Sequence, residues 1–242
     1  MTEMVRRFLR QKFGSIGVVI ALAVLSLLTA FQVAAAGKGS ALESGGFIAL
    51  LILAAGSVSK DSSSGALQMI LARPIRRVDY LFGRYCGILL AYAISLAATV
   101  GLALAFSPVF GKLLGKETAR ELSLTDLARG AAGSLLSATL LAAALLFFST
   151  FLRGFGDVLA YFLLSLLLGA PELLARPLHA PWLSDLGTAA RENILPRVEW
   201  EDVLRGEKIL SPATGEYVLA VTVYLTLAAW IFSRREFSYG YD

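Results

Sequence analysis

Charge and reactive side chains are both scarce in this chain of 242 residues. Only 17% of its residues are Asp, Glu, Lys or Arg, whereas soluble domains contain about 25%. One cysteine excludes an intramolecular disulfide, and one histidine with three methionines leaves little for soft-metal ligation. The net charge of +4 is too small to favour nucleic-acid binding. With 57% hydrophobic residues and a mean hydropathy of +0.69, the chain has the composition of a membrane protein.

The chain also lacks a recognisable nucleotide-binding or catalytic motif. Gly111–Glu117 superficially resembles a phosphate loop, but it has one residue too few between its glycines, and Glu117 stands where Ser or Thr would hold magnesium. The only histidine, His179, lies in proline-rich sequence without a nearby nucleophile or second metal ligand. We therefore predict no catalytic residue and no metal site, and any ATPase that acts with this protein must be a separate chain.

Long apolar blocks predict an all-α membrane protein with six transmembrane helices, because a span needs about 20 apolar residues. The second, fifth and sixth blocks are short, and we expect the second to continue into Ser57–Lys60 and the fifth to begin in Phe155–Asp157. Five spans is the alternative if the second block does not cross the membrane. Charge is essentially absent from the block interiors, which argues against an ion-coupled pump or a cation channel. The predicted spans are Ile16–Ala36, Gly45–Ser59, Leu81–Phe106, Leu127–Leu152, Val158–Ala170 and Tyr217–Ser233.

The distribution of charge predicts that both termini are cytoplasmic. With that orientation, the short inside segments hold more than half of the Lys and Arg residues but only a third of the Asp and Glu residues. Residues 1–15 then form a basic amphipathic helix in the inner headgroup plane. Residues 171–216 become the largest extracytoplasmic segment, and their prolines and apolar stretches predict short interfacial or re-entrant helices.

The cytoplasmic segment 60–80 has the pattern of a short helix followed by a break. Asp61 and Ser62–Ser64 can cap a helix start, and the next residues are good helix formers. Pro74 disfavours helix at the residue before it, so the helix should end there. We predict a platform that docks a soluble partner. It has an apolar face of Leu67, Ile70 and Leu71, and Arg76 and Arg77 are placed to meet anionic headgroups or an acidic partner surface.

Small residues spaced four apart occur in two predicted spans and favour close helix packing. They are Gly83 and Gly87 in the third span, and Gly133 and Ser137 in the fourth. Packing within one chain is the simpler interpretation, and a dimer interface is the more specific hypothesis.

The segment Ser59–Tyr85 resembles the cytoplasmic loop of type-2 ABC transporter permeases. The similarity rests on a serine-rich start, Gly65-Ala-Leu67, Leu71-Ala-Arg-Pro-Ile-Arg-Arg77 and Gly83-Arg-Tyr85, and the basic tail Ile231–Phe237 is also similar. The resemblance implies that the segment contains a coupling helix, which docks on a cytoplasmic ATP-binding subunit. It implies as contact residues Asp61, Leu67, Ile70, Leu71, Arg73, Arg76 and Arg77. ATP and magnesium would then be bound by that subunit, and this chain would bind no cofactor. The loop of Arg153 and Asp157 is a weaker second contact.

The same resemblance implies an exporter with two permease subunits, identical or paralogous, and two ATPases in the inner (cytoplasmic) membrane. Membrane lipids and an extracytoplasmic protein are further possible partners. A second hypothesis is a non-transporting membrane anchor or assembly factor for a soluble protein. A membrane-embedded enzyme is a third, but the chain has no polar cluster to support it. Neither the substrate nor the direction of transport follows from the sequence.

Overall fold

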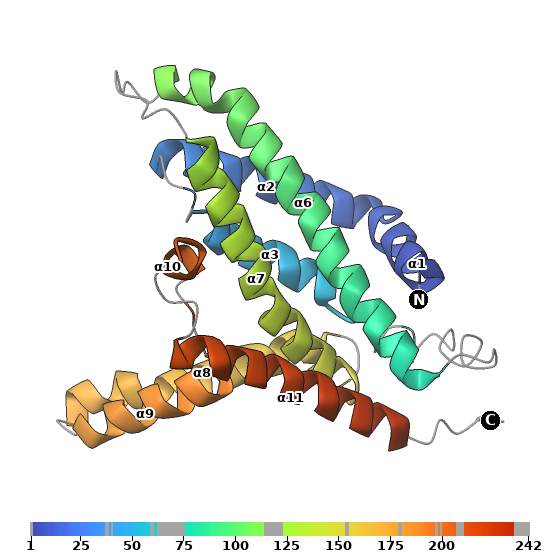
Figure 1. Ribbon diagram of the computed structural model, residues 1–242, viewed down its shortest axis with the longest axis vertical. Helices are drawn as coiled ribbons and strands as arrows, with labels where there is room; N and C mark the ends of the chain where they lie inside the picture. The colour runs from blue at the N-terminus through green and yellow to red at the C-terminus, as the bar shows by residue number, and fades with distance from the viewer. Residues whose placement is uncertain are drawn as a thin grey trace. The chain divides into compact units, whose positions relative to one another are not determined.

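Helices account for all the regular secondary structure in the described part of the chain (Figure 1). They are α1 (Thr2–Phe13), α2 (Ile16–Ala36), α3 (Ala41–Ala54), α6 (Arg77–Leu113), α7 (Leu124–Ser149), α8 (Gly156–Leu178), α9 (Pro181–Ile194), α10 (Trp200–Leu204) and α11 (Pro212–Arg234). The computed structural model describes residues 2–36, 39, 41–58, 61, 76–113, 123–152, 155–178, 181–196, 198, 200–206 and 211–234. The all-α prediction is confirmed for these residues.

Four described helices are long and apolar enough to cross a membrane: Ile16–Ala35, Arg77–Phe106, Leu124–Ser149 and Pro212–Arg234. Each coincides with a span predicted from the sequence. The other two predicted spans are present as the shorter apolar stretches Gly45–Ala54 and Gly156–Pro171. Four spans are therefore supported by length and composition, and the six-span arrangement stays a prediction.

Several helix boundaries differ from the sequence-based expectation. Helix α3 does not continue into Ser57–Lys60 but ends at Ala54, and a turn follows in which Gly56 has a φ of 64°. Helix α6 extends at both ends, to Arg77 and Leu113. Helix α8 begins at Gly156, as expected, but it continues through Pro171 to Leu178. Since α8 packs along α9, tertiary contacts compensate for the backbone donor that proline lacks.

The chain divides into two compact units, which we describe separately. Unit 1 comprises Met1–Ala54, Phe82–Ala142 and Glu199–Lys208, and unit 2 comprises Ala55–Leu81, Ala143–Val198 and Ile209–Asp242.

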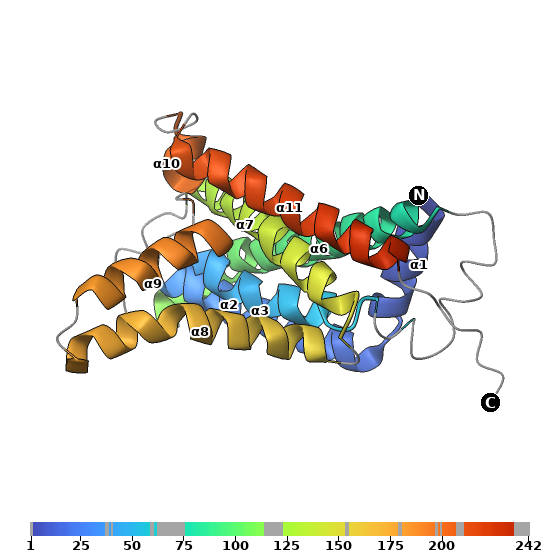
Figure 2. The ribbon, with the colours of Figure 1, turned by 90° about the horizontal axis from the view of Figure 1, so that it is seen from below.

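In unit 1, α2 packs along α3, whereas α1 runs crosswise to α2 (Figure 2). One aromatic side chain holds α1 in place: Phe8 is fully buried against α6, where a Cβ on Gly87 would lie 2.9 Å from its Cδ1 atom. The Arg84 guanidinium lies 5.3 Å from the Phe8 ring centroid and donates a 3.1 Å hydrogen bond to Gln11 Oε1. This cation–π contact and hydrogen bond explain how a buried arginine is accommodated.

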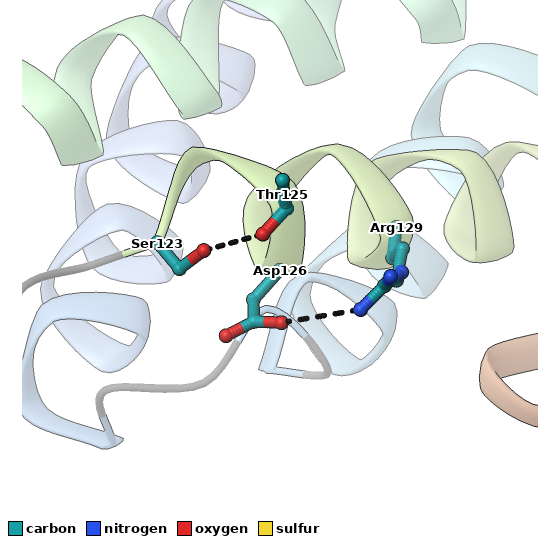
Figure 3. A network of polar contacts seen from close by, with 4 residues as sticks. All are labelled: Ser123, Thr125, Asp126 and Arg129. Atoms are coloured by element: carbon teal, nitrogen blue, oxygen red, sulfur yellow. Dashed lines mark hydrogen bonds and ion pairs between the residues drawn. The ribbon is translucent and has the colours of Figure 1, made fainter. Parts of the chain in front are cut away.

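The start of α7 is capped by Ser123. Its backbone carbonyl accepts hydrogen bonds from the N–H groups of Asp126 and Leu127, at 3.0 and 3.1 Å. Its hydroxyl contacts that of Thr125, and Asp126 lies 3.7 Å from Arg129 one turn further on (Figure 3). Serine is a preferred N-cap residue, and an acidic side chain in the first turn favours the helix dipole.

In unit 2, α8 and α9 lie side by side (Figures 1 and 2), and α11 also contacts α9. An aromatic contact joins α7 to α11, with the Phe147 and Tyr224 ring centroids 5.8 Å apart. Tyr224 also donates a 3.1 Å hydrogen bond to the carbonyl of Ile194 at the end of α9. Unit 2 therefore holds the ends of several helices together, and it also contains both ends of the segment 60–80.

Candidate functional site

The turn that follows α3 is built on Gly56. A φ of 64° is in the left-handed region, which glycine adopts without the steric cost that a Cβ imposes. The turn spans residues 55–58 and ends the apolar helix α3. Two of its backbone amides face the ends of neighbouring helices in unit 2.

Two polar side chains hold this turn. The N–H of Gly56 donates a 2.8 Å hydrogen bond to Oδ2 of Asp157 in the first turn of α8. The N–H of Val58 donates a 3.0 Å hydrogen bond to Oγ of Ser149, the last residue of α7. Asp157 and Ser149 are 0% and 1% exposed. The bond to Val58 is therefore shielded from water, and the bond to Gly56 is partly shielded. Buried backbone amides need such partners, and a carboxylate acceptor makes the stronger kind of bond.

Asp157 satisfies a second group at the same point. Its Oδ1 atom accepts a 2.9 Å hydrogen bond from the N–H of Val158, one of the free amides at the start of α8. The carboxylate thus bridges α8 and the turn, and its negative charge is favourable at a helix N-terminus.

Residues of α6 and α11 hold the C-terminal end of the segment 60–80. The hydroxyl of Tyr80 donates a 2.8 Å hydrogen bond to Oδ2 of Asp61, and both side chains are buried. The Tyr80 ring stacks on Phe232 with centroids 5.6 Å apart. Arg77 Nη1 donates a 2.8 Å hydrogen bond to the carbonyl of Ser233. These contacts attach the start of α6 to the end of α11.

We call these residues the anchor cluster. All of them belong to unit 2, and together they join the two ends of the segment 60–80 to the ends of α7, α8 and α11. If residues 62–75 moved, these contacts would therefore also move α7, α8 and α11. The segment itself connects α3 and α6. The anchor cluster consists of Gly56, Val58, Asp61, Arg77, Tyr80, Ser149, Asp157, Phe232 and Ser233.

Some predicted docking residues are described by the structure and others are not. Leu67, Ile70, Leu71, Arg73 and Arg153 lie outside the described residues. Arg76 is exposed and Arg77 is half-buried.

Asp61 and Asp157 are buried, so their carboxylates do not present an exposed surface to a soluble protein. Their contacts with Tyr80 and Gly56 are internal to unit 2. Docking itself stays a prediction.

The predicted packing residues lie on α6 and α7. Gly83, Gly87 and Gly133 are buried and Ser137 is half-buried. Gly87 faces Phe8 of α1, a contact that the four-residue spacing did not indicate.

Sequence reasoning missed most of the anchor cluster. Ser149 and Ser233 are hydroxyl residues near the ends of apolar blocks, and Tyr80 directly precedes such a block. Their position next to the end of an apolar block was the available signal in the sequence. It does not indicate which distant group each side chain contacts. Among the described residues, no group of three His, Cys, Asp or Glu side chains is placed to hold a metal ion.

Several apolar helices of spanning length, with a polar junction that joins their ends, define a multi-pass helical membrane protein. A family model described as "ABC-2 family transporter protein" matches residues 41–175, more than half of the chain. The chain belongs to this family, as its resemblance to type-2 permeases predicted. It is a membrane permease component of an ABC transporter. No curated protein matches the chain. The matched range contains the segment 60–80 and the part of the anchor cluster from Gly56 to Asp157.

Proposed function

We propose that this permease couples ATP hydrolysis by a separate cytoplasmic ATPase subunit to export across the membrane. The observation that carries the proposal is the anchor cluster, because it ties both ends of the predicted coupling segment to the ends of three further helices. Permeases of this family work with an ATP-binding subunit, which supports the nature of the partner. ATP and magnesium would be bound by that subunit.

The coupling step is a displacement of the segment when the ATPase subunits close. Residues 62–75 would carry the docking contacts, with Leu67, Ile70 and Leu71 as the apolar ones and exposed Arg76 beside them. A short linkage with hydrogen bonds at both ends transmits displacement better than a loop attached only through its peptide backbone. The anchor cluster would therefore move the ends of α7, α8 and α11 together.

Buried Asp61 and Asp157 act in this proposal as anchors. A carboxylate that accepts hydrogen bonds inside the protein orients the segment, while the exposed contacts with the ATPase come from residues further along it. Arg77 has both roles, since its guanidinium binds the end of α11 and is half-exposed.

The proposed topology places the anchor cluster and both termini in the cytoplasm, and segment 171–216 outside. The positive-inside distribution of charge supports this orientation, and the membrane would be the inner (cytoplasmic) one. A second permease copy or paralogue would complete a dimer, and α9 and α10 would face an extracytoplasmic partner or the substrate exit.

A charge placed on the docking face tests the assignment. Leu67→Asp should abolish co-purification of the ATPase, because burying an unpaired carboxylate in an apolar interface is costly. Leu204→Asp is the matched control, since Leu204 is 37% exposed on α10, on the proposed opposite side of the membrane. The control should retain the ATPase, and both variants should insert and elute as the parent protein does.

Two outcomes would contradict the proposal. Retention of the ATPase by Leu67→Asp, with normal ATP-dependent turnover in lipid, would refute docking through this segment. A stable complex in which ATP drives no movement of any solute would instead support the anchor or assembly-factor hypothesis.

A further inference from the structure

A hollow lined by hydroxyl groups lies inside unit 1, where α2, α3 and α6 meet. It is large enough for about one water molecule. The lining residues fall in the middle of α2 and α6, both of which are long enough to span a membrane. Apart from Leu25, Leu42, Ala49 and Leu96, the hollow is lined by Ser26, Thr29, Gly45, Gly46, Tyr92, Ser95 and Thr99.

Three of these hydroxyls have no hydrogen-bond partner within the part of the chain that the structure describes. They belong to Ser26, Thr29 and Ser95, which are 6%, 5% and 7% exposed. Two other hydroxyls at the hollow are satisfied: Tyr92 bonds Ser134 at 2.5 Å, and Thr99 donates to the carbonyl of Ser95 at 2.9 Å. The cluster is therefore polar and only partly satisfied.

Two glycines of α3 bring its backbone close to these hydroxyls. A Cβ on Gly45 would collide with the Thr29 side chain, and one on Gly46 would collide with the Tyr92 hydroxyl. Among the side chains that the structure describes, no charged one lines the hollow. Its chemistry thus suits a small neutral molecule that both donates and accepts hydrogen bonds.

We propose that this hollow is a binding site for an ordered water molecule, held by the hydroxyls of Ser26, Thr29 and Ser95. Buried polar groups are normally satisfied, and a cavity of this size with two to four polar partners is what a structural water requires. In an apolar bilayer the alternative is three hydroxyls without partners, which is unfavourable. The proposal concerns the interior of this chain alone and does not depend on an ATPase.

Hydroxyl-radical footprinting by brief X-ray exposure tests the site, because a bound water generates radicals that modify the side chains beside it. The purified full chain in lipid nanodiscs is the sample. Tyr92 lines the hollow, whereas Tyr85 is a buried tyrosine on the same helix, outside the lining, whose hydroxyl donates a 3.2 Å hydrogen bond to the carbonyl of Thr139. We expect modification of Tyr92 and protection of Tyr85.

Two variants identify the groups that hold the water. Combining Thr29→Val with Ser95→Ala removes two hydroxyls and should abolish modification of Tyr92, whereas Thr29→Ser keeps a hydroxyl and should preserve it. Equal protection of Tyr92 and Tyr85 in the parent protein would overturn the proposal by showing a dry hollow, even if the double variant failed to fold. Unchanged modification of Tyr92 in a folded double variant would also overturn it. Elongated density in the hollow, in a structure that resolves waters, would also overturn the proposal. It would show that the bound group belongs to a lipid or a substrate and is not water.

Discussion

Replacing Asp157 with alanine should loosen the turn that precedes the proposed coupling segment. The buried carboxylate accepts a hydrogen bond from the N–H of half-buried Gly56, and a bond of this charge-assisted kind contributes about 1.5–3 kcal/mol. Its position in the first turn of α8 adds about 0.3–1 kcal/mol through the helix dipole. We therefore expect Asp157→Ala to cost about 2–4 kcal/mol, and this loss should be concentrated at the turn.

Amide hydrogen exchange measures this effect where it arises. Losing the bond to Gly56 should speed exchange of its amide by about 10- to 100-fold, because each 1.4 kcal/mol of lost protection corresponds to about a factor of 10. Ser149→Ala removes a neutral acceptor, so exchange at Val58 should rise less, by about 3- to 10-fold. Asp79→Ala is the control, since Asp79 is an exposed acidic residue in the first turn of α6.

The same variants link the anchor cluster to function. If the turn transmits movement, Asp157→Ala should keep the ATPase bound while lowering the stimulation of ATP hydrolysis in lipid. Exchange at Gly56 that stays at the parent rate, or rises equally in Asp79→Ala, would refute the assignment of Asp157 as an anchor.

Two further substitutions test packing in each unit. Gly87→Leu should push Phe8 away from α6 and destabilise the protein by about 1–3 kcal/mol, seen as a lower apparent melting temperature in detergent, whereas Gly101→Leu should have little effect because no atom lies within 4 Å of its Cβ position. Tyr80→Phe should cost about 1.5–3 kcal/mol by removing the hydrogen bond to buried Asp61 while keeping the ring stack. An unchanged melting temperature in Tyr80→Phe would show that this hydrogen bond does not hold the segment.

The apolar blocks of the sequence predicted helix positions well because hydropathy acts over many residues. Four blocks correspond to helices of spanning length, and the two short blocks are also helical. Boundaries were less predictable. The expected continuation of the second helix into Ser57–Lys60 was wrong, because the positive φ of Gly56 turns the chain there. The fifth helix passes Pro171, where contacts with α9 outweigh the local preference.

Hydrogen bonds between residues far apart in the sequence could not be predicted from local patterns. Gly56 and Asp157 are 101 residues apart, and Arg77 and Ser233 are 156 residues apart, so no local pattern relates them. The same applies to the hydroxyl-lined hollow, whose polar residues are ordinary members of three apolar helices. A single serine or threonine carries little weight in a hydropathy profile.

By itself, the sequence determined that this is a multi-pass helical membrane protein of the ABC-2 family, because spanning length, low charge and the motif of segment 60–80 are all properties of contiguous residues. Only the tertiary structure decided what holds that segment and what the helices enclose. Hydrogen bonds at 2.8–3.0 Å between helix ends, and a hollow between α2, α3 and α6, arise from the packing of elements far apart in the chain. Burial then makes single polar side chains such as Asp157 and Thr29 important for stability, because an apolar interior offers no water to replace a lost hydrogen-bond partner.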